Sequence, residues 1–546
     1  MLSLALQTVL LLVLFVPSVF LWRRYTSSVR RLNGPPSASF WRGCNLGQIY
    51  ARDGWRYHRE LVEKYGGAVK IHGLLGCHQV YVSDPKAMYH MLVKDAAIYE
   101  ETTWYTDGNM LVFGPGLLST VGDHHRKQRR MLNPVFSIKN IRNLTPMFYS
   151  VVQKLRDAIL LQTKNGPHEI DMLMWMSRAA LEIVGTGGLG TSIDPLVPDP
   201  KAITAYGKSI KDLIPCAFRL SMFRMFIPFF KSLGPPAFRR LLLELTPSSN
   251  LQRIKHTVDV MTETSESIYR EKLQALRKGD EVVIKQLGEG KDVMSILLKA
   301  NTSAAASERL PEDELIAQMS TFMFAGHDTT SSALSQILYC LAKNAGEQNK
   351  LREEIITSGI VDRDEVSYDE LMTLPYLDAI CKETLRVHPP INFMARTARK
   401  DVILPLGTPC KSEDGQSEMD HLCIREGQNL IVAFGAVNRL KSVWGADAEE
   451  WKPERWLAPL PKSVADAHIA GVYSSLMTFS AGPRSCIGFK YAELEMKMIL
   501  AVLVKSFRFE LPTDKTIVWN LGGIQTPAIQ GSETARPQLP LWVSRI

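Results

Sequence analysis

The sequence has few cysteines, and no two of them have the short spacing that is typical of a metal site or a disulfide framework. Eight cysteines are scattered over 546 residues, and none forms a Cys-x-x-Cys arm of the kind that holds zinc. The spacing does not resemble the disulfide framework of a small secreted domain either. The cysteines therefore exclude a disulfide scaffold and a two-armed zinc site, and they favour reduced thiols that face the cytosol.

A concentrated block of positive charge is also missing. The formal net charge of +8 is modest for 546 residues, and no basic stripe carries the aromatic residues that nucleic-acid binding requires. No internal repeat is evident. With 45% hydrophobic and 22% charged residues, the composition is that of a large globular protein without a nucleic-acid partner.

A nicotinamide or flavin site is excluded by its context. Residues 185–190 read Gly-Thr-Gly-Gly-Leu-Gly and match Gly-x-Gly-x-x-Gly letter for letter. A dinucleotide fingerprint must follow a strand and open a helix, whereas this one follows the helical pattern of Met172–Val184. We expect these glycines to end that helix.

The first part of the chain lacks charge. No charged side chain occurs from Leu2 to Trp22, which is long enough to span a bilayer. Arginines follow this run, whereas a cleaved signal peptide, which is the alternative, carries its positive charge before it. We expect a transmembrane anchor at 2–22 with the bulk of the chain in the cytosol, a basic and Pro-rich linker at 23–36, and a catalytic domain at 37–546.

The most informative stretch is 479–488, directly before a strongly apolar helical pattern over Phe489–Ser506. A cysteine at the start of a helix lies where backbone N–H groups and the helix dipole stabilise a thiolate. Cys486 is therefore a candidate metal ligand, and a small buried hydrophobic residue is the alternative. Gly482 and Gly488 would let the backbone pass close to something flat.

Arg484 adds a fixed fork of donors suited to carboxylates, and haem, with one iron and two carboxylates, meets all of these requirements. The run resembles the Phe-x-x-Gly-x-Arg-x-Cys-x-Gly loop of the cytochrome P450 haem-thiolate monooxygenases, and the resemblance extends from about Pro35 onward. It implies a mainly α fold with a smaller β-rich lobe, preceded here by one transmembrane helix. It also implies haem b as the cofactor, with Cys486 as the axial ligand of the iron. The loop residues that it places at the haem are Phe479, Gly482, Arg484, Cys486 and Gly488.

A basic helix is predicted within Gly122–Ser137, and simple solvation is its plainest explanation. The family has Trp-x-x-x-Arg at this point, and both residues contact a haem propionate. Arg129 matches the arginine, whereas His125 replaces the tryptophan and could still donate an N–H to a carboxylate. Arg396 matches another propionate-binding position. The remaining basic residues of the helix would face an acidic electron donor.

A long buried helix is predicted from about Pro311 to Leu341, because Pro followed by acids is typical of a helix start. Its middle places Asp328 and Thr329 where apolar residues should continue. A bond from Thr329 back to the preceding turn is the structural alternative. The run Ala-Gly-His-Asp-Thr-Thr resembles the oxygen-activation signature of the family. The resemblance implies that Thr329 belongs to the hydrogen-bond network around dioxygen and Asp328 to the proton relay.

Three further residues match the structural support of the haem loop in the family. Glu383 and Arg386 lie three residues apart in a helical pattern over Tyr376–Val387 and could be an ordinary surface pair. The family has Glu-x-x-Arg here, which pairs with a basic residue of a later Pro-Glu-Arg segment, present as Arg455. By this resemblance the three residues support the fold and take no part in the reaction.

The resemblance also indicates where a substrate binds. The aromatic segment 214–236 corresponds to the substrate-access lid of the family, and it is either ordinary core or a segment that dips into the membrane interface. The residues expected to line the pocket are Phe322, Ala325, Ile391, Phe393 and Met394.

Local composition predicts several smaller elements. Two short strands are expected at Ala68–His72 and Gln79–Val82. Polar stretches predict exposed loops at 278–292 and 299–312, and an exposed loop insertion between strands at 408–420.

The predicted function is that of a monooxygenase anchored in the endoplasmic reticulum membrane, with a cytosolic catalytic domain. It would insert one oxygen atom from O2 into a lipophilic terpenoid, steroid, fatty acid or polycyclic aromatic, in secondary metabolism or xenobiotic oxidation. Two electrons per turnover must come from a partner, since the chain has no flavin or nicotinamide site. The resemblance indicates NADPH-cytochrome P450 reductase, with cytochrome b5 as a further candidate.

Two alternatives remain. The first is a haem-thiolate peroxygenase or isomerase that needs no reductase, against which Asp328 and Thr329 argue. The second is a non-catalytic haem sensor on the membrane, whose only nearby distal ligand would be His327. That histidine lies about 100° around the helix from its neighbours, so it could point away from the haem.

Overall fold

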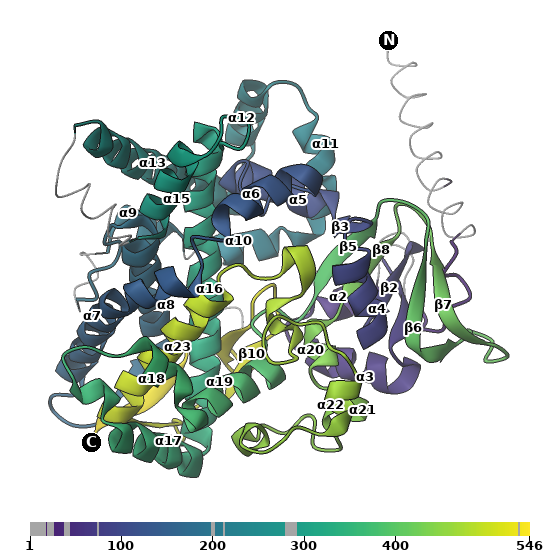
Figure 1. The fold of residues 1–546 in the computed structure, drawn as a ribbon. Coiled ribbons are helices and arrows are strands. Elements are labelled where there is room, and N and C mark those ends of the chain that lie inside the picture. The colour runs from purple at the N-terminus through teal and green to yellow at the C-terminus, as the bar shows by residue number, and fades with distance from the viewer. Residues whose placement is uncertain are drawn as a thin grey trace.

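The structure, a computed structural model, describes Ser18 and residues 27–37, 44–73, 76–197, 203–210, 213–278, 292–532 and 536–546. Over these ranges the predicted mainly helical fold with a smaller β-rich lobe is confirmed (Figure 1). The predicted anchor at 2–22, apart from Ser18, and residues 23–26 of the linker lie outside the described residues. Among the helices that are described, none is both long and apolar enough to cross a membrane.

Helices make up most of the fold. The longer ones are α3 (Trp55–Tyr65), α5 (Thr103–Phe113), α6 (Gly122–Leu132), α7 (Ile138–Gln162), α8 (Met172–Ile183), α12 (Pro236–Leu245), α13 (Ser249–Lys278), α15 (Val293–Ser303), α16 (Glu312–Lys343), α17 (Ala345–Ser358), α19 (Pro375–Val387) and α23 (Phe489–Ser506).

Short helices connect these elements. They are α2 (Cys44–Ile49), α4 (Pro85–Tyr89), α9 (Ala205–Ser209), α10 (Leu213–Arg219), α11 (Ile227–Lys231), α18 (Tyr368–Thr373), α20 (Phe434–Val437), α21 (Lys441–Trp444) and α22 (Lys462–Asp466). The π-helical segments are η2 (His90–Lys94) and η3 (Val184–Leu189), and the 3-10 segments are η6 (Ser221–Phe226), η7 (Ile360–Asp362), η8 (Pro453–Trp456), η9 (Met477–Phe479) and η10 (Gly482–Arg484).

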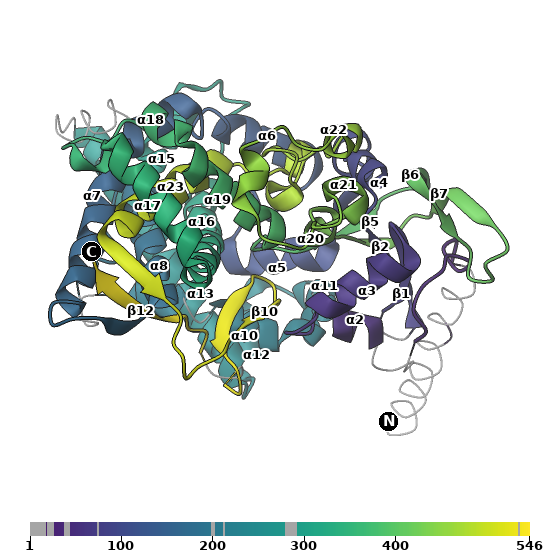
Figure 2. The same ribbon diagram turned by 90° about the horizontal axis from the view of Figure 1, so that it is seen from below.

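The strands gather mainly in the lobe opposite the carboxyl terminus (Figure 2). They are β1 (Ala68–His72), β2 (His78–Val82), β3 (Tyr99–Glu101), β4 (His168–Asp171), β5 (Met394–Ala398), β6 (Val402–Lys411), β7 (Glu418–Ile424), β8 (Asn429–Val432), β9 (Phe507–Glu510), β10 (Ile517–Asn520), β11 (Thr526–Ile529) and β12 (Pro540–Arg545). The largest sheet has the order β1-β2-β8-β5-β3. The strands predicted at Ala68–His72 and Gln79–Val82 are confirmed as β1 and β2, the second beginning one residue earlier.

Helix α16 runs through the centre of the molecule (Figures 1 and 2). Pro311 precedes it, three acids occupy its first turn and Lys343 lies in its last turn, so both ends are favoured by the helix dipole. Its 32 residues span about 48 Å. A Cβ at Gly326 would lie 2.7 Å from Val184 Cγ2, so glycine here allows η3 to pack closely against α16.

The glycine-rich run at 185–190 ends α8, as predicted. It forms most of η3, whose final turn is closed by Gly190 in the left-handed region at φ +73°. A helix therefore precedes these glycines and no dinucleotide turn is formed.

Two predicted loops are wrong in part. Helix α15 continues to Ser303, because Asp292 caps its start by accepting from Ser295 N at 2.8 Å and its apolar face is buried. Residues 408–420 mostly belong to the antiparallel hairpin β6–β7, whose register shifts between Pro405 and Cys410. In both segments polar side chains suggested loops, but backbone pairing and burial of the opposite face hold regular structure.

Candidate functional site

The Cys486 loop is held against η2. Cys486 N donates to Phe479 O at 2.8 Å. Gly482 has φ +65°, and a Cβ there would lie 1.8 Å from Leu92 O, so this close approach to η2 requires glycine. A Cβ at Gly488 would meet only the Phe136 ring, at 3.9 Å. At Gly482 the close protein neighbour is therefore the η2 backbone.

Cys486 is exposed to solvent. Desolvation by the protein around the thiol raises the pKa of Cys486, and the Gly488 N–H and the Arg129 guanidinium act in the opposite direction. The Gly488 N–H at the helix start favours the thiolate, as expected from the sequence, whereas desolvation penalises this charged form. A coordinated metal ion would supply the missing positive charge.

Three arginines are candidates for holding carboxylates: Arg484 in the loop, Arg129 on α6 and Arg396 on β5. Arg129 Nη1 donates to Ser485 O at 2.5 Å and its Nη2 to Ser485 Oγ at 3.3 Å. Arg484 Nη2 donates to Thr120 O at 2.7 Å. Arg396 is 1% exposed, and its Nη2 has no partner among the described residues. A buried guanidinium donor without an acceptor fits an acidic ligand, so this set of one thiol and three arginines fits haem and its two carboxylates.

His125 lies on α6, one turn before Arg129. It is 4% exposed, and its pKa is lowered to about 3 by burial and by Arg484, Arg129 and Arg126. The imidazole is therefore neutral at physiological pH and retains one N–H that can donate to an acceptor.

The middle of α16 presents its polar residues in different directions. Thr329 Oγ1 donates to Ala325 O at 2.8 Å, which is the local bond weighed from the sequence. His327 is fully buried, and its Nε2 lies 2.7 Å from Ser177 Oγ on α8. Its Nδ1 lies 3.1 Å from Asp328 Oδ1. His327 is therefore engaged with α8, as a residue that points away from the haem would be.

Phe136 brings the middle of α16 and the Cys486 loop together. Its ring lies beside Gly488 and packs edge-on against Phe322, with 5.4 Å between the centroids. Ala325, one turn after Phe322, is exposed although most of this helix is buried.

The other residues predicted for the pocket lie on the β-rich side. Phe393 contacts Tyr50 and His58, with ring centroids 5.0 and 5.2 Å away. Ile391 precedes it, and Met394 begins β5, where it pairs with Val432. Phe393 is therefore engaged with α3 and the end of α2.

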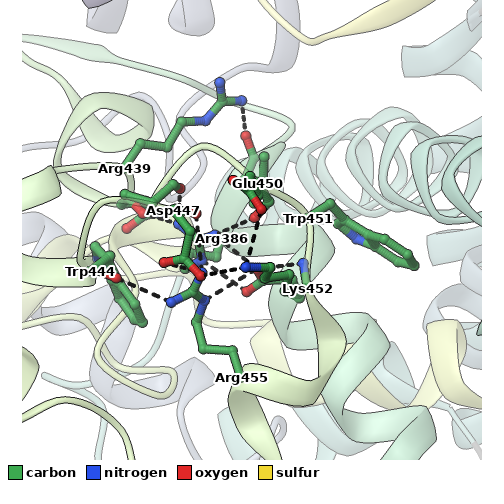
Figure 3. Close-up of polar contacts among 12 residues, drawn as sticks. Arg386, Arg439, Trp444, Asp447, Glu450, Trp451, Lys452 and Arg455 are labelled. Atoms are coloured by element: carbon green, nitrogen blue, oxygen red, sulfur yellow. Dashed lines mark hydrogen bonds and ion pairs between the residues drawn. The ribbon is translucent and has the colours of Figure 1, made fainter.

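Glu383 and Arg386 form a fully buried ion pair on α19, with both oxygen–nitrogen distances at 2.8 Å. Arg386 also donates to the carbonyl oxygens of Asn438, Ala448 and Glu450. Arg455 Nε lies 3.4 Å from Glu383 Oε1. Figure 3 shows Arg386 and Arg455 within one network of polar contacts that includes Asp447 and Lys452. The structure thus brings the three support residues together.

Sequence reasoning missed three residues at this site. Glu100 and Glu101 on β3 contact Arg484 and Arg396, and Ser177 on α8 contacts His327. The only available signal was the pair of adjacent acids in a short strand, and no spacing rule connects them to arginines hundreds of residues away.

Comparison with known proteins agrees with this geometry. The family profile described as "Cytochrome P450" matches residues 34–527. The chain is 48% identical to "Cytochrome P450 monooxygenase 81" of Postia placenta over 527 residues, covering 96% of this chain and 95% of that protein. It is 41% identical to "Ganoderic acid synthetase CYP5150L8" of Ganoderma lucidum over 524 residues, covering 95% and 94% of the two chains. The chain therefore belongs to the cytochrome P450 family of haem-containing monooxygenases.

Proposed function

We propose that this protein is a membrane-associated monooxygenase that inserts one oxygen atom from O2 into a lipophilic substrate, with Cys486 as the axial ligand of haem b. The single observation that carries the proposal is the exposed Cys486 just before α23, whose sulfur accepts the Gly488 N–H and lies near the Arg129 guanidinium. When bound, the haem supplies the binding and reductive activation of O2, and the thiolate ligand favours O–O cleavage.

The residues of the chain have separate roles in this proposal. Arg129, Arg396 and Arg484 hold the haem carboxylates, and His125 contributes a neutral N–H donor. Phe479, Gly482 and Gly488 shape the loop. The unpartnered Arg396 Nη2 supports this assignment because a buried cationic donor needs an acceptor.

Asp328 and Thr329 manage protons. The Thr329 hydroxyl donates to Ala325 O, which orients its oxygen lone pairs away from that carbonyl and leaves them able to accept a hydrogen bond. Asp328, one residue earlier on α16, is the proposed relay for the proton. This pair favours a monooxygenase over the peroxygenase, isomerase and sensor alternatives, and His327 is occupied by Ser177 instead of being a distal ligand.

The proposed substrate is an apolar molecule of terpenoid, steroid, fatty-acid or polycyclic aromatic type that enters from lipid. Phe322, Ala325, Ile391 and Met394 are proposed to contact it. Phe223, Phe226, Phe229 and Phe230 are large exposed apolar residues within the 214–236 segment, and such a surface suits the membrane interface. One relative is named a ganoderic acid synthetase, which favours a biosynthetic role over detoxification.

The proposed location is the endoplasmic reticulum membrane, with residues 2–22 as the anchor and NADPH-cytochrome P450 reductase as the electron donor. Cytochrome b5 is a second candidate donor. Helix α6 supports an acidic partner because it carries Arg126 and Arg130 on exposed positions and Lys127 on a half-buried one.

The test is the reduced, carbon-monoxide-bound difference spectrum of the purified full-length protein beside Cys486→Ala. We expect a strongly red-shifted Soret band in the wild type and none in the variant. A wild type without haem, or a variant that keeps the shifted band, contradicts the assignment of Cys486.

A further inference from the structure

Two adjacent glutamates on β3 each contact one of the arginines assigned to the haem carboxylates. Glu101 lies directly opposite Arg396 in the antiparallel pairing of β3 with β5. Glu101 Oε2 and Arg396 Nη1 are 2.6 Å apart, and their side chains are 5% and 2% exposed. The contact is therefore a buried ion pair in which charge interactions are only weakly screened.

Glu100 makes the corresponding contact on the other face of the strand, as alternation of side chains requires. Its Oε2 lies 3.2 Å from Arg484 Nη2, and both side chains are mostly buried. Its Oε1 accepts from Gly122 N, the first residue of α6, at 3.1 Å. Glu100 therefore joins the start of the helix that carries His125 and Arg129 to the Cys486 loop.

The charges around the site interact with one another. Burial and the Glu101 carboxylate raise the pKa of Tyr105 to about 12, and Arg396 and Arg484 act in the opposite direction. The Tyr105 hydroxyl thus lies within the electrostatic field of Glu101 and of the two arginines. Three arginines against two glutamates leave one net positive charge, whereas a bound haem brings two carboxylates of its own.

A fixed negative charge in a buried site opposes the addition of an electron to a nearby metal centre. We propose that Glu100 and Glu101 set the electrostatic potential of the cofactor site, holding the reduction potential of the haem iron below the value that the arginines alone would give. This inference rests on the proposed function. Glu101 also positions Arg396, because it engages Nη1 while Nη2 has no partner among the described residues.

The test is the reduction potential of the purified holoenzyme, measured by spectroelectrochemistry with redox mediators. We expect Glu100→Gln and Glu101→Gln each to raise the potential and the double variant to raise it further. Glu101→Asp, which keeps the charge, should stay near the wild type. The matched control is Glu370→Gln on α18, which removes one charge from an exposed ion pair with Arg363 and should not change the potential.

The possible outcomes separate the two proposals. If the variants keep the red-shifted carbon monoxide band but their potentials equal that of Glu370→Gln, the charge role is overturned while the monooxygenase assignment stands. The charge role is also overturned if the reduction potential of Glu101→Asp shifts as far as that of Glu101→Gln. If Glu101→Gln does not fold, the less buried Glu100→Gln decides the question alone. A wild type without the shifted band overturns the proposed function itself.

Discussion

Thr329 and Thr321 show how the same local bond can serve different purposes. Each hydroxyl donates to the carbonyl four residues earlier on α16, at 2.8 Å. Thr321 is 3% exposed, whereas Thr329 is partly exposed and follows Asp328. The back-bond therefore does not identify the functional threonine, but the surroundings of the two side chains differ.

Thr329→Val, which keeps the size and removes the hydroxyl, should lower product formed per NADPH by about tenfold or more, because proton delivery is lost. Hydrogen peroxide should rise in proportion, and the carbon monoxide band should persist. Thr329→Ser should recover product. Thr321→Val is the control with the same chemical change, and equal loss of coupling in both valine variants would refute the assignment. Product and peroxide are measured with the reductase present.

His58 is a buried histidine with a structural task. Its Nε2 donates to Ile49 O at 3.0 Å, so its Nδ1 accepts from the Tyr81 hydroxyl at 2.9 Å. Its ring stacks on Trp55 and Phe393. Burial lowers the pKa of His58 to about 4, so the folded protein holds this imidazole neutral.

The unfolded chain binds a proton at His58 below about pH 6.5, whereas the folded protein does so only near pH 4. Stability from this residue is therefore complete above pH 6.5 and falls by about 3 kcal/mol as the pH drops to 4. The test is urea unfolding of His58→Gln at pH 7 and pH 5. In this variant the free energy of unfolding should fall less between the two pH values than it does in the wild type. His421→Gln, which replaces an exposed histidine, should show the same fall as the wild type. An equal fall in the two variants would contradict the argument.

At the scale of elements, the Cys486 loop and η2 depend on each other through one glycine. The backbone of Gly482 occupies the left-handed region and lies against Leu92 O, whereas Gly488 at the start of α23 has φ −93° and a Cβ there would make only an ordinary contact with Phe136. The two glycines are equivalent in the sequence motif but not in the structure.

Gly482→Ala should prevent normal haem incorporation, because its Cβ would lie 1.8 Å from Leu92 O in a backbone conformation that disfavours alanine. Gly346→Ala on α17, where a Cβ would meet nothing within 4 Å, should retain the red-shifted carbon monoxide band, with a stability within about 1 kcal/mol of the wild type. The measurement is haem content together with thermal unfolding. Equal effects of the two alanines would show that the Leu92 contact does not decide the requirement.

At the scale of the whole molecule, the Glu383–Arg386 pair ties α19 to the irregular segment 438–456. Arg386 reaches three carbonyl oxygens of that segment, and Glu383 accepts from Lys452 N at 3.0 Å and from Trp456 Nε1 at 2.9 Å. Both partners are fully buried, so neither charge can be solvated if the other is removed.

Arg386→Ala should destabilise the protein by about 3–5 kcal/mol, because it leaves a buried carboxylate uncompensated. The control is Arg363→Ala, which breaks an exposed pair with Glu370 and should cost at most about 1 kcal/mol. Guanidinium unfolding followed by the Soret absorbance and by circular dichroism measures both. Comparable losses would mean that the buried network contributes little.

The sequence alone determined the elements whose signals are local. The apolar period placed α23 at Phe489–Ser506, Pro and acids located the start of α16, and the spacing of Glu383 and Arg386 placed both on one face of α19. The Cys486 loop was recognisable because its residue types occur within ten positions. In each case the physical cause acts within a few turns of the chain.

Only the tertiary structure decided the contacts between distant segments. Glu100 meets Arg484 across 384 positions, Glu101 meets Arg396 across 295, and Ser177 meets His327 across 150. The requirement for glycine at 482 and the hairpin over 408–420 likewise come from a neighbouring backbone. Such contacts depend on the path of the folded chain, since a residue type determines which bonds a side chain can make but not which partner the fold brings within hydrogen-bond distance.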